Sequence, residues 1–332
     1  MRTLYFLVPG TTSKFGGGGL WAELKTVNLA RQICAAEIVT YRQREPDRLF
    51  LADLLDRPHC NNSDDRIFVV SWGFDVPKLV AQLGNRPTIY HAHSAGYGFN
   101  LPPQIPIVTV SRNTMGYWGA RSPNSLIYYL PNQIGDEFRD RSTSRDIDVL
   151  VQARKSSEYL LDRLIPALQP RCRVEQLTGF VEDLAGLFNR SQIYLYDSAE
   201  YWGTSGVSEG FGLPPLEALA CGCQVFSSVN HSLADYLDPG FNCHKIAAFD
   251  LDYDLERILA VLNAPPEPLP EAFFKSYREA NLVERLRTIL EEINTFFDRR
   301  GEFASPIAGL NRWRLGQLWM KRSIAKVRKK LG

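Results

Sequence analysis

Short apolar runs alternate with amphipathic stretches along most of the chain. Residues 3–8 form a run rich in Leu, Tyr, Phe and Val that ends at a Pro-Gly pair, which is typical of a strand buried on both faces. The next stretch repeats apolar residues at helical spacing, on a face formed by Leu20, Leu24, Val27, Ala30 and Ile33. Strands that alternate with helices indicate a mostly parallel sheet, with ligand-binding loops at the carboxyl ends of its strands.

The same alternation continues through both halves of the chain, and 332 residues are enough for two domains. The second half begins near Arg145. From Glu271 to Phe297 the apolar spacing predicts one long amphipathic helix. Further strands, with helices between them, are predicted at 35–41, 66–73, 87–97, 105–111, 145–151, 173–180, 191–198, 223–229 and 240–246.

The segment 208–222, with the sequence SEGFGLPPLEALACG, combines a glycine-bearing loop with the start of a helix. Prolines suit the first turn of a helix, and Gly222 suits the residue that follows its end. Unpaired amides at such a helix start bind anions. Glu209 and Glu217 would repel a phosphate unless each points at a neutral hydroxyl beside it, where a carboxylate accepts a strong hydrogen bond. The alternative is a capped helix with one exposed acid in its first turn.

Glu209, seven intervening residues and Glu217, with GFGLP between them and EALACG after them, resemble the signature of retaining GT-B glycosyltransferases of the GT4 type. The resemblance implies an α/β fold of two Rossmann-like domains whose parallel sheets face each other across a cleft, with a C-terminal helix crossing back to the first domain. It implies a sugar moved from a nucleotide-sugar donor to a glycan or lipid-linked acceptor with retained anomeric configuration. The expected domains are 1–140, on the acceptor side, 141–295, which binds the donor, and a helical basic tail at 296–332 that returns toward the first domain.

The resemblance also implies roles for residues of the second domain. Glu209 would orient the transferred sugar as a catalytic residue, and Glu217 would hold the ribose. Arg154 and Lys155 would grip the diphosphate, although side chains of adjacent residues in an extended segment point opposite ways, so that one of the two would serve alone. The remaining donor-binding residues are the nucleotide-base contact Gly179 and the diphosphate-binding amides of Gly210, Phe211, Gly212 and Leu213.

In the first domain, His93 corresponds to a histidine that the family places near the transferred sugar, and it is the second catalytic candidate. His91 is its neighbour, and a structural histidine is the alternative for either. The glycine tract at residues 16–19 would bring backbone close to the acceptor or the phosphate. The alternative is that the tract is a surface loop. Trp21 stands where the dinucleotide fingerprint needs its last glycine, which argues against NAD binding. The tract consists of Gly16, Gly17, Gly18 and Gly19.

Neither metal nor cofactor is expected. Cys221 and Cys223 lack the second ligand pair of a zinc site, and the Asp252-Tyr-Asp254 sequence falls in a helical segment away from the cleft. The net charge of +1 gives no indication of nucleic acid as a partner. The scattered cysteines and the short apolar run at the N-terminus favour a cytoplasmic protein.

The tail from Arg312 to Lys330 has eight basic residues, no acidic residue and two tryptophans. Such a helix suits an anionic membrane surface, which would make the protein peripheral at the inner membrane face. The alternative is that its apolar face packs on the first domain. Two other functions stay open: a nucleotide-sugar epimerase, which would convert donor without acceptor, and a non-catalytic GT-B partner tethered to the membrane.

Overall fold

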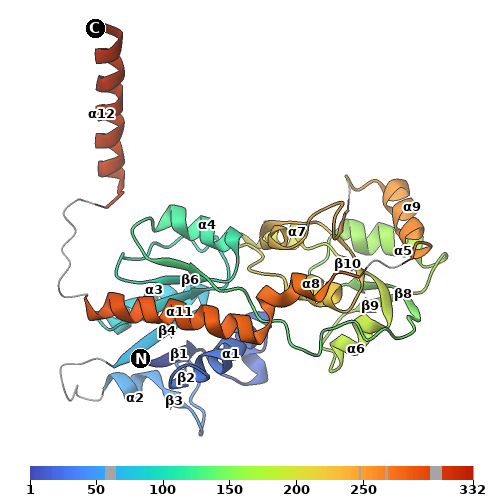
Figure 1. The fold of residues 1–332 in the computed structure, drawn as a ribbon, viewed down its shortest axis with the longest axis horizontal. Coiled ribbons are helices and arrows are strands. Elements are labelled where there is room, and N and C mark those ends of the chain that lie inside the picture. The colour runs from blue at the N-terminus through green and yellow to red at the C-terminus, as the bar shows by residue number, and fades with distance from the viewer. Residues whose placement is uncertain (57–64, 247, 266–267, 300–308, 332) are drawn as a thin grey trace.

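The computed structural model describes residues 1–56, 65–246, 248–265, 268–299 and 309–331 and contains two α/β domains (Figure 1). Each domain is built on one parallel sheet, one of seven strands and one of five. The predicted fold class is confirmed, because strands with continuous apolar runs became parallel strands with helices on both faces.

The first sheet has the strand order β3-β2-β1-β4-β5-β6-β7, and every neighbouring pair is parallel. All five residues of β5 are buried, which explains its lack of polar alternation. The strands are β1 (Thr3–Val8), β2 (Ala36–Thr40), β3 (Leu49–Phe50), β4 (Arg66–Val70), β5 (Thr88–Ala92), β6 (Ile107–Thr109) and β7 (Ile127–Tyr129).

Helices cover both faces of this sheet. One face packs on α1, and the other packs on side chains of α2, α3 and α4. The helix predicted from Leu20 onward is confirmed as α1, which begins two residues earlier, within the glycine tract. These helices are α1 (Gly18–Arg31), α2 (Leu51–Leu55), α3 (Val76–Leu83) and α4 (Arg112–Arg121).

The second sheet has the order β12-β11-β10-β8-β9, again with all pairs parallel. Its strands are β8 (Ile147–Gln152), β9 (Val174–Leu177), β10 (Ser191–Tyr196), β11 (Gln224–Ser227) and β12 (His244–Lys245). Its helices are α5 (Ile165–Leu168, after a π-helical turn at Leu160–Leu164), α6 (Leu184–Asn189), α7 (Ala199–Ser205), α8 (Leu213–Ala220) and α9 (Leu251–Leu262).

The helix that crosses back to the first domain is α11 (Glu279–Asp298), and it closes the same face of the first sheet as α1 (Figure 1). Its buried residues Leu282, Leu286 and Ile293 pack in one cluster with Leu4 and Val69. The second domain was expected to extend to residue 295, yet the apolar face of α11 belongs to the core of the first.

The single helix predicted from Glu271 to Phe297 is interrupted. A short helix α10 (Glu271–Phe274) and a 3₁₀ turn precede α11, with Arg278 in extended conformation between them. The Arg278 guanidinium donates hydrogen bonds to the carbonyl oxygens of Gly135 (2.8 Å) and Phe138 (2.9 Å) in the segment that links the domains. The break therefore lets the chain turn from one domain to the other.

The last helix, α12 (Arg312–Leu331), stands away from both domains (Figure 1). Helix α12 itself therefore does not return to the first domain, whereas Phe297, at the end of α11, packs in the core of that domain, and a Cβ on Gly309 would lie 2.8 Å from Nδ2 of Asn124. None of the helices in the described ranges combines the length and apolar content that crossing a bilayer requires.

Candidate functional site

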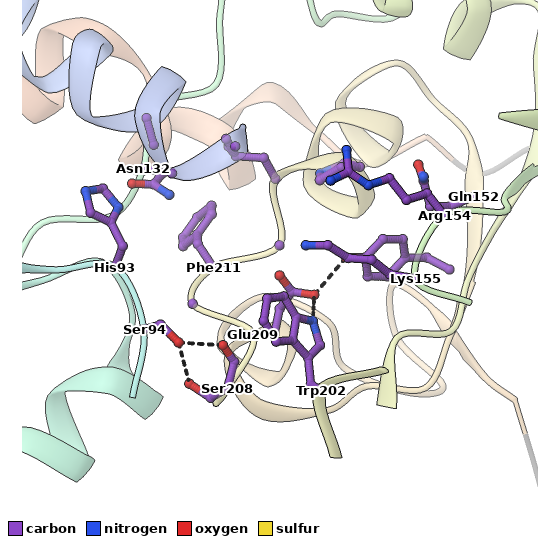
Figure 2. Close-up of a pocket in the computed structure, with 18 of the residues that line it drawn as sticks. His93, Ser94, Asn132, Gln152, Arg154, Lys155, Trp202, Ser208, Glu209 and Phe211 are labelled. Atoms are coloured by element: carbon purple, nitrogen blue, oxygen red, sulfur yellow. Dashed lines mark hydrogen bonds between the residues drawn. The ribbon is translucent and has the colours of Figure 1, made fainter. Parts of the chain in front are cut away.

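A cavity of about 360 Å³ lies between the two domains and takes its walls from both (Figure 2). Of the residues predicted from the sequence, it brings together Gly18, Gly19, His93, Arg154, Lys155, Glu209, Gly210, Phe211, Gly212 and Leu213. Gly16, Gly17, Gly179 and Glu217 are not among its lining residues. The two halves of the predicted site thus meet in one space.

Glu209 lies in the wall of this cavity and is only 6% exposed. Its Oε2 atom accepts three hydrogen bonds, from the hydroxyls of Tyr196 (2.7 Å) and Ser198 (3.1 Å) and from Nε1 of Trp202 (2.5 Å). Three donors on one oxygen fix the position of the carboxylate. Within the described part of the chain no hydrogen bond to Oε1 is recorded, so this oxygen can accept a ligand hydroxyl.

The backbone of residues 210–213 forms part of the cavity wall. Among the described residues, no acceptor is recorded for the four N–H groups of this segment. Two carbonyl oxygens of the loop already have donors, because that of Glu209 accepts from Ser232 Oγ (2.8 Å) and that of Gly212 accepts from the Tyr236 hydroxyl. A loop with held carbonyls and unpaired amides is a candidate anion site.

The start of helix α8 determines which amides of this site are free to donate. Pro214 and Pro215 occupy the first turn of α8 and have no N–H, so the amide of Leu213 is the donor that the helix itself offers there. Gly212 precedes the helix with φ +77°, and a Cβ on it would lie 2.3 Å from Cδ2 of Leu233. Only glycine fits this turn.

The segment 208–210 also touches the first domain. A Cβ on Gly210 would lie 1.5 Å from the carbonyl oxygen of His93. Ser94 Oγ donates to the carbonyl oxygen of Ser208 (2.6 Å), and the Ala95 amide donates to Ser208 Oγ (3.0 Å). The same loop therefore forms the candidate anion site and a direct contact between the two domains.

Arg154 and Lys155 follow β8 and both line the cavity (Figure 2). Lys155 has φ +70°, a left-handed conformation that turns the chain, so the opposite orientation of adjacent side chains does not apply here. Its Nζ lies 4.3 Å from the centroid of the Trp202 ring. Burial lowers the pKa of Lys155, and the negative charge of Glu209 opposes that shift.

Glu217 and Gly179 lie outside the cavity wall. Glu217 is on α8 and only 6% exposed, and burial raises its pKa to about 7, with Lys25 opposing that shift. Gly179 is exposed after β9, beside Phe180, whose side chain is 90% exposed. Their predicted contacts with ribose and base stay predictions.

His93 is held by Glu23, a buried residue of α1 that the sequence did not single out. Glu23 Oε2 lies 2.8 Å from Nε2 of His93 and 2.5 Å from Nδ1 of His91. Burial alone would raise the pKa of Glu23, but the two imidazoles outweigh it and bring the pKa to about 2. Burial also lowers the pKa of His93. A neutral His93 that donates from Nε2 keeps Nδ1 as a hydrogen-bond acceptor.

The cluster of Glu23, His91 and His93 has the composition of a metal site. Its distances are those of hydrogen bonds, since ligand atoms on one tetrahedral zinc lie about 3.3 Å apart. Both imidazoles also share one carboxylate oxygen. We therefore interpret the cluster as a hydrogen-bonded unit that fixes the tautomer of His93.

The glycine tract meets the cavity at the first residues of α1. Gly18 and Gly19 line the cavity, and a Cβ on Gly17, Gly18 or Gly19 would meet no atom within 4 Å. None of these residues has positive φ. The tract therefore leaves open space beside the cavity and is not required for a strained turn.

Several lining residues were missed at the sequence level. Asn132 and Gln152 face the cavity (Figure 2), and Trp202 belongs to α7, a helix that the sequence pattern did not predict. The only hint in the sequence was the pair of aromatic residues, Tyr201 and Trp202, in this segment. Nothing in the sequence indicated that Trp202 would donate to Glu209.

Comparison with known proteins agrees with this geometry. A family model described as glycosyl transferases group 1 matches residues 150–291. Over 112 residues the chain is 30% identical to the serotype-specific mannosyltransferase WbdA of Escherichia coli, an alignment that covers 32% of this chain and 11% of WbdA. The chain thus spans about a tenth of the length of the curated relatives it matches.

Solved structures share the fold at low identity. The glycosyltransferase from Rickettsia africae ESF-5 is 13% identical with a TM-score of 0.61, covering 88% of this chain and 98% of that one. Anabaena Alr3699/HepE, solved in complex with UDP-glucose, is 14% identical with a TM-score of 0.57, covering 91% and 99%. Residues 150–291 therefore carry the sequence features of the glycosyl transferases group 1 family, and the chain has the two-domain GT-B fold of glycosyltransferases.

Proposed function

We propose that the protein is a retaining glycosyltransferase that moves a sugar from a nucleotide-sugar to a glycan or lipid-linked acceptor. One observation carries the proposal. The unpaired amides of residues 210–213 and two cations, Arg154 and Lys155, surround one cavity together with the fixed carboxylate of Glu209. A diphosphate with a sugar attached needs this combination of groups.

Departure of the leaving group builds negative charge on the diphosphate. Fixed N–H dipoles and cations aimed at it stabilise the transition state, because they need no reorganisation when the charge develops. Glu209 Oε1 accepts from a hydroxyl of the sugar, and Nδ1 of His93 accepts from another hydroxyl across the cavity. Glu217 takes the ribose hydroxyls once the donor reaches α8.

The chemistry needs no metal ion, since amides and cations already offset the charge of the phosphates. We expect transfer to continue in the presence of EDTA and to gain nothing from added Mg²⁺. Loss of activity with the chelator and its return with Mg²⁺ would contradict this part of the proposal.

The first donors to test follow from the relatives. HepE was solved with UDP-glucose, and WbdA is named a mannosyltransferase. A thermal-shift screen of UDP-, GDP-, dTDP- and ADP-sugars, with glucose and mannose as the first sugars, identifies the donor. Transfer to acceptor glycans is then measured by mass spectrometry, and the anomeric configuration of the product by NMR.

The variant Glu209→Gln keeps the size of the side chain and loses its charge. We expect transfer at least about a hundredfold slower, since removal of one fixed polar group from such a site has an effect of that size. Glu256→Gln, on the exposed face of α9, is the matched control. Unchanged transfer and donor binding in Glu209→Gln would refute the assignment, and an epimer formed from donor alone would indicate an epimerase.

We place the enzyme in the cytoplasm, at the inner face of the membrane where a lipid-linked acceptor would be met. The five cysteines in the described ranges are free thiols, which suits a reducing compartment.

A further inference from the structure

Helix α12 carries a stripe of apolar side chains that no other part of the described structure covers. Trp313, Met320, Ile324 and Val327 recur at helical spacing, and all lie within about 30° of one line along the helix. Their exposed fractions are 79%, 51%, 55% and 55%. A stripe of this kind is stable only against another apolar surface.

Cations border the stripe on both sides. With about 100° per residue, Arg312 lies on one edge, and Lys321 and Arg328 lie on the other. Trp319, which is 70% exposed, falls beside Arg312. Tryptophan is the aromatic residue most suited to the boundary between lipid and water.

The charge of the chain is divided between α12 and the two domains. Eight of the 38 basic residues lie between Arg312 and Lys330, and no acidic residue does. The remaining 30 basic residues face 37 acidic ones, which gives the rest of the chain a net charge of −7. The domains alone would be repelled by an anionic surface, so any attraction to it comes from α12.

We propose that α12 is an interfacial helix that holds the protein on an anionic lipid bilayer. The helix, about 30 Å long, lies parallel to the surface with its apolar stripe among the acyl chains. The bordering cations then sit level with the lipid phosphates, where each Lys or Arg adds attraction. This inference depends on α12 alone, so its failure would leave the proposed transferase activity intact.

The test uses the full-length chain and vesicles of phosphatidylcholine with or without phosphatidylglycerol. We expect flotation with the anionic vesicles only, weakening as NaCl rises. A charge variant replaces Lys321, Arg322, Arg328 and Lys329 with Gln, and a stripe variant replaces Trp313, Met320 and Ile324 with Ser. Each should bind anionic vesicles at least about tenfold more weakly, while the thermal shift with the donor stays the same.

A matched control changes four exposed cations of the domains, Arg48, Lys78, Arg163 and Arg171, to Gln. This variant should bind vesicles like the wild type. Equal binding by the wild type and the two α12 variants would overturn the proposal. Dimers of the wild type that the stripe variant abolishes would also overturn it, because the stripe would then bind a second copy of the chain. Protection of α12 from hydrogen exchange without vesicles would overturn it too, because the stripe would then pack on the chain's own domains.

Discussion

Three buried glutamates of the candidate site differ in what surrounds each carboxylate. Glu209 accepts three hydrogen bonds on one oxygen, and Glu23 accepts from two imidazoles. Glu217 is buried, and no described residue is recorded as a donor to its carboxylate. The spacing of Glu209 and Glu217 was visible in the sequence. Glu23 was not, because a glutamate in an amphipathic helix is ordinarily a solvated residue. Its role depends on histidines 68 and 70 positions away.

Glu23 should act through His93, as a positioning residue. We expect Glu23→Ala to lower kcat about tenfold, an effect within the range of a lost charged hydrogen bond, with nucleotide binding unchanged. Glu23→Gln should recover part of the activity, because its carbonyl oxygen still accepts from Nε2 of His93. In a protein that already carries His93→Ala, Glu23→Ala should cause little further decrease in kcat. An equal loss in both backgrounds, measured by steady-state kinetics, would show that Glu23 only supports the fold.

Glu217 should make stability depend on pH. Its pKa of about 7 in the folded protein lies above the ordinary 4.5, so the folded state binds the proton more tightly than the unfolded state. The contribution of protonated Glu217 to the free energy of unfolding is fully present below pH 4.5. It is lost as the pH rises toward 7, by about 3 kcal/mol in all.

Glu217→Gln should remove this loss. The free energy of unfolding of the variant minus that of the wild type, from urea titrations, should grow between pH 4.5 and pH 8. Glu256→Gln is the exposed control and should show a constant difference. A flat difference for Glu217→Gln would mean that the Glu217 carboxyl titrates normally.

At the scale of elements, the strands were the most predictable part of the molecule. Continuous apolar runs predicted the bounds of five strands to within a few residues, because a strand buried on both faces needs apolar residues at nearly every position. These strands are β1, β4, β5, β8 and β10. Helix α7 was missed because its sequence, AEYWGTS, has two glycine or serine breakers and no clear apolar stripe. The break before α11 was missed because apolar spacing continued across it.

The loop before α8 should tolerate no side chain at Gly210. In Gly210→Ala the new Cβ would overlap the carbonyl oxygen of His93, so the domains must separate there. We expect each domain to stay folded by circular dichroism and transfer to fall about tenfold or more. Gly203→Ala is the matched control, because a Cβ at Gly203 on α7 would meet no atom within 4 Å. Wild-type kinetics in Gly210→Ala would show that the domain contact is not needed.

At the scale of the whole molecule, the sequence resemblance indicated two domains, a cleft and a crossing helix, and these were confirmed. What it did not predict is how closely the domains meet. That contact depends on residues such as Ser94 and Ser208, which are 114 positions apart and carry no signal in the sequence. The resemblance also implied that the basic tail would return toward the first domain, whereas α11 is the helix that crosses back and α12 stands away.

Arg278 connects the domains where the chain crosses between them. Arg278→Ala would remove the guanidinium hydrogen bonds to the carbonyl oxygens of Gly135 and Phe138, and we expect a loss of about 1–3 kcal/mol in the free energy of unfolding. Chemical denaturation measures this loss. Arg287→Ala on α11, where the one ion pair of Arg287 recorded among the described residues is a 3.7 Å contact with Glu284, should change stability by less than about 0.5 kcal/mol. Equal effects of the two substitutions would contradict the prediction.

The contact between Gly210 and His93 limits how the two domains of this fold can be recombined. A chimaera that joins the second domain of this chain to the first domain of another GT-B protein inherits a loop shaped for one particular neighbour. Its new partner must present backbone, without a side chain, opposite Gly210 and must supply groups that pair with Ser208. Exchanges of the first domain are therefore expected to succeed when residues 93–96 are carried along with the second domain.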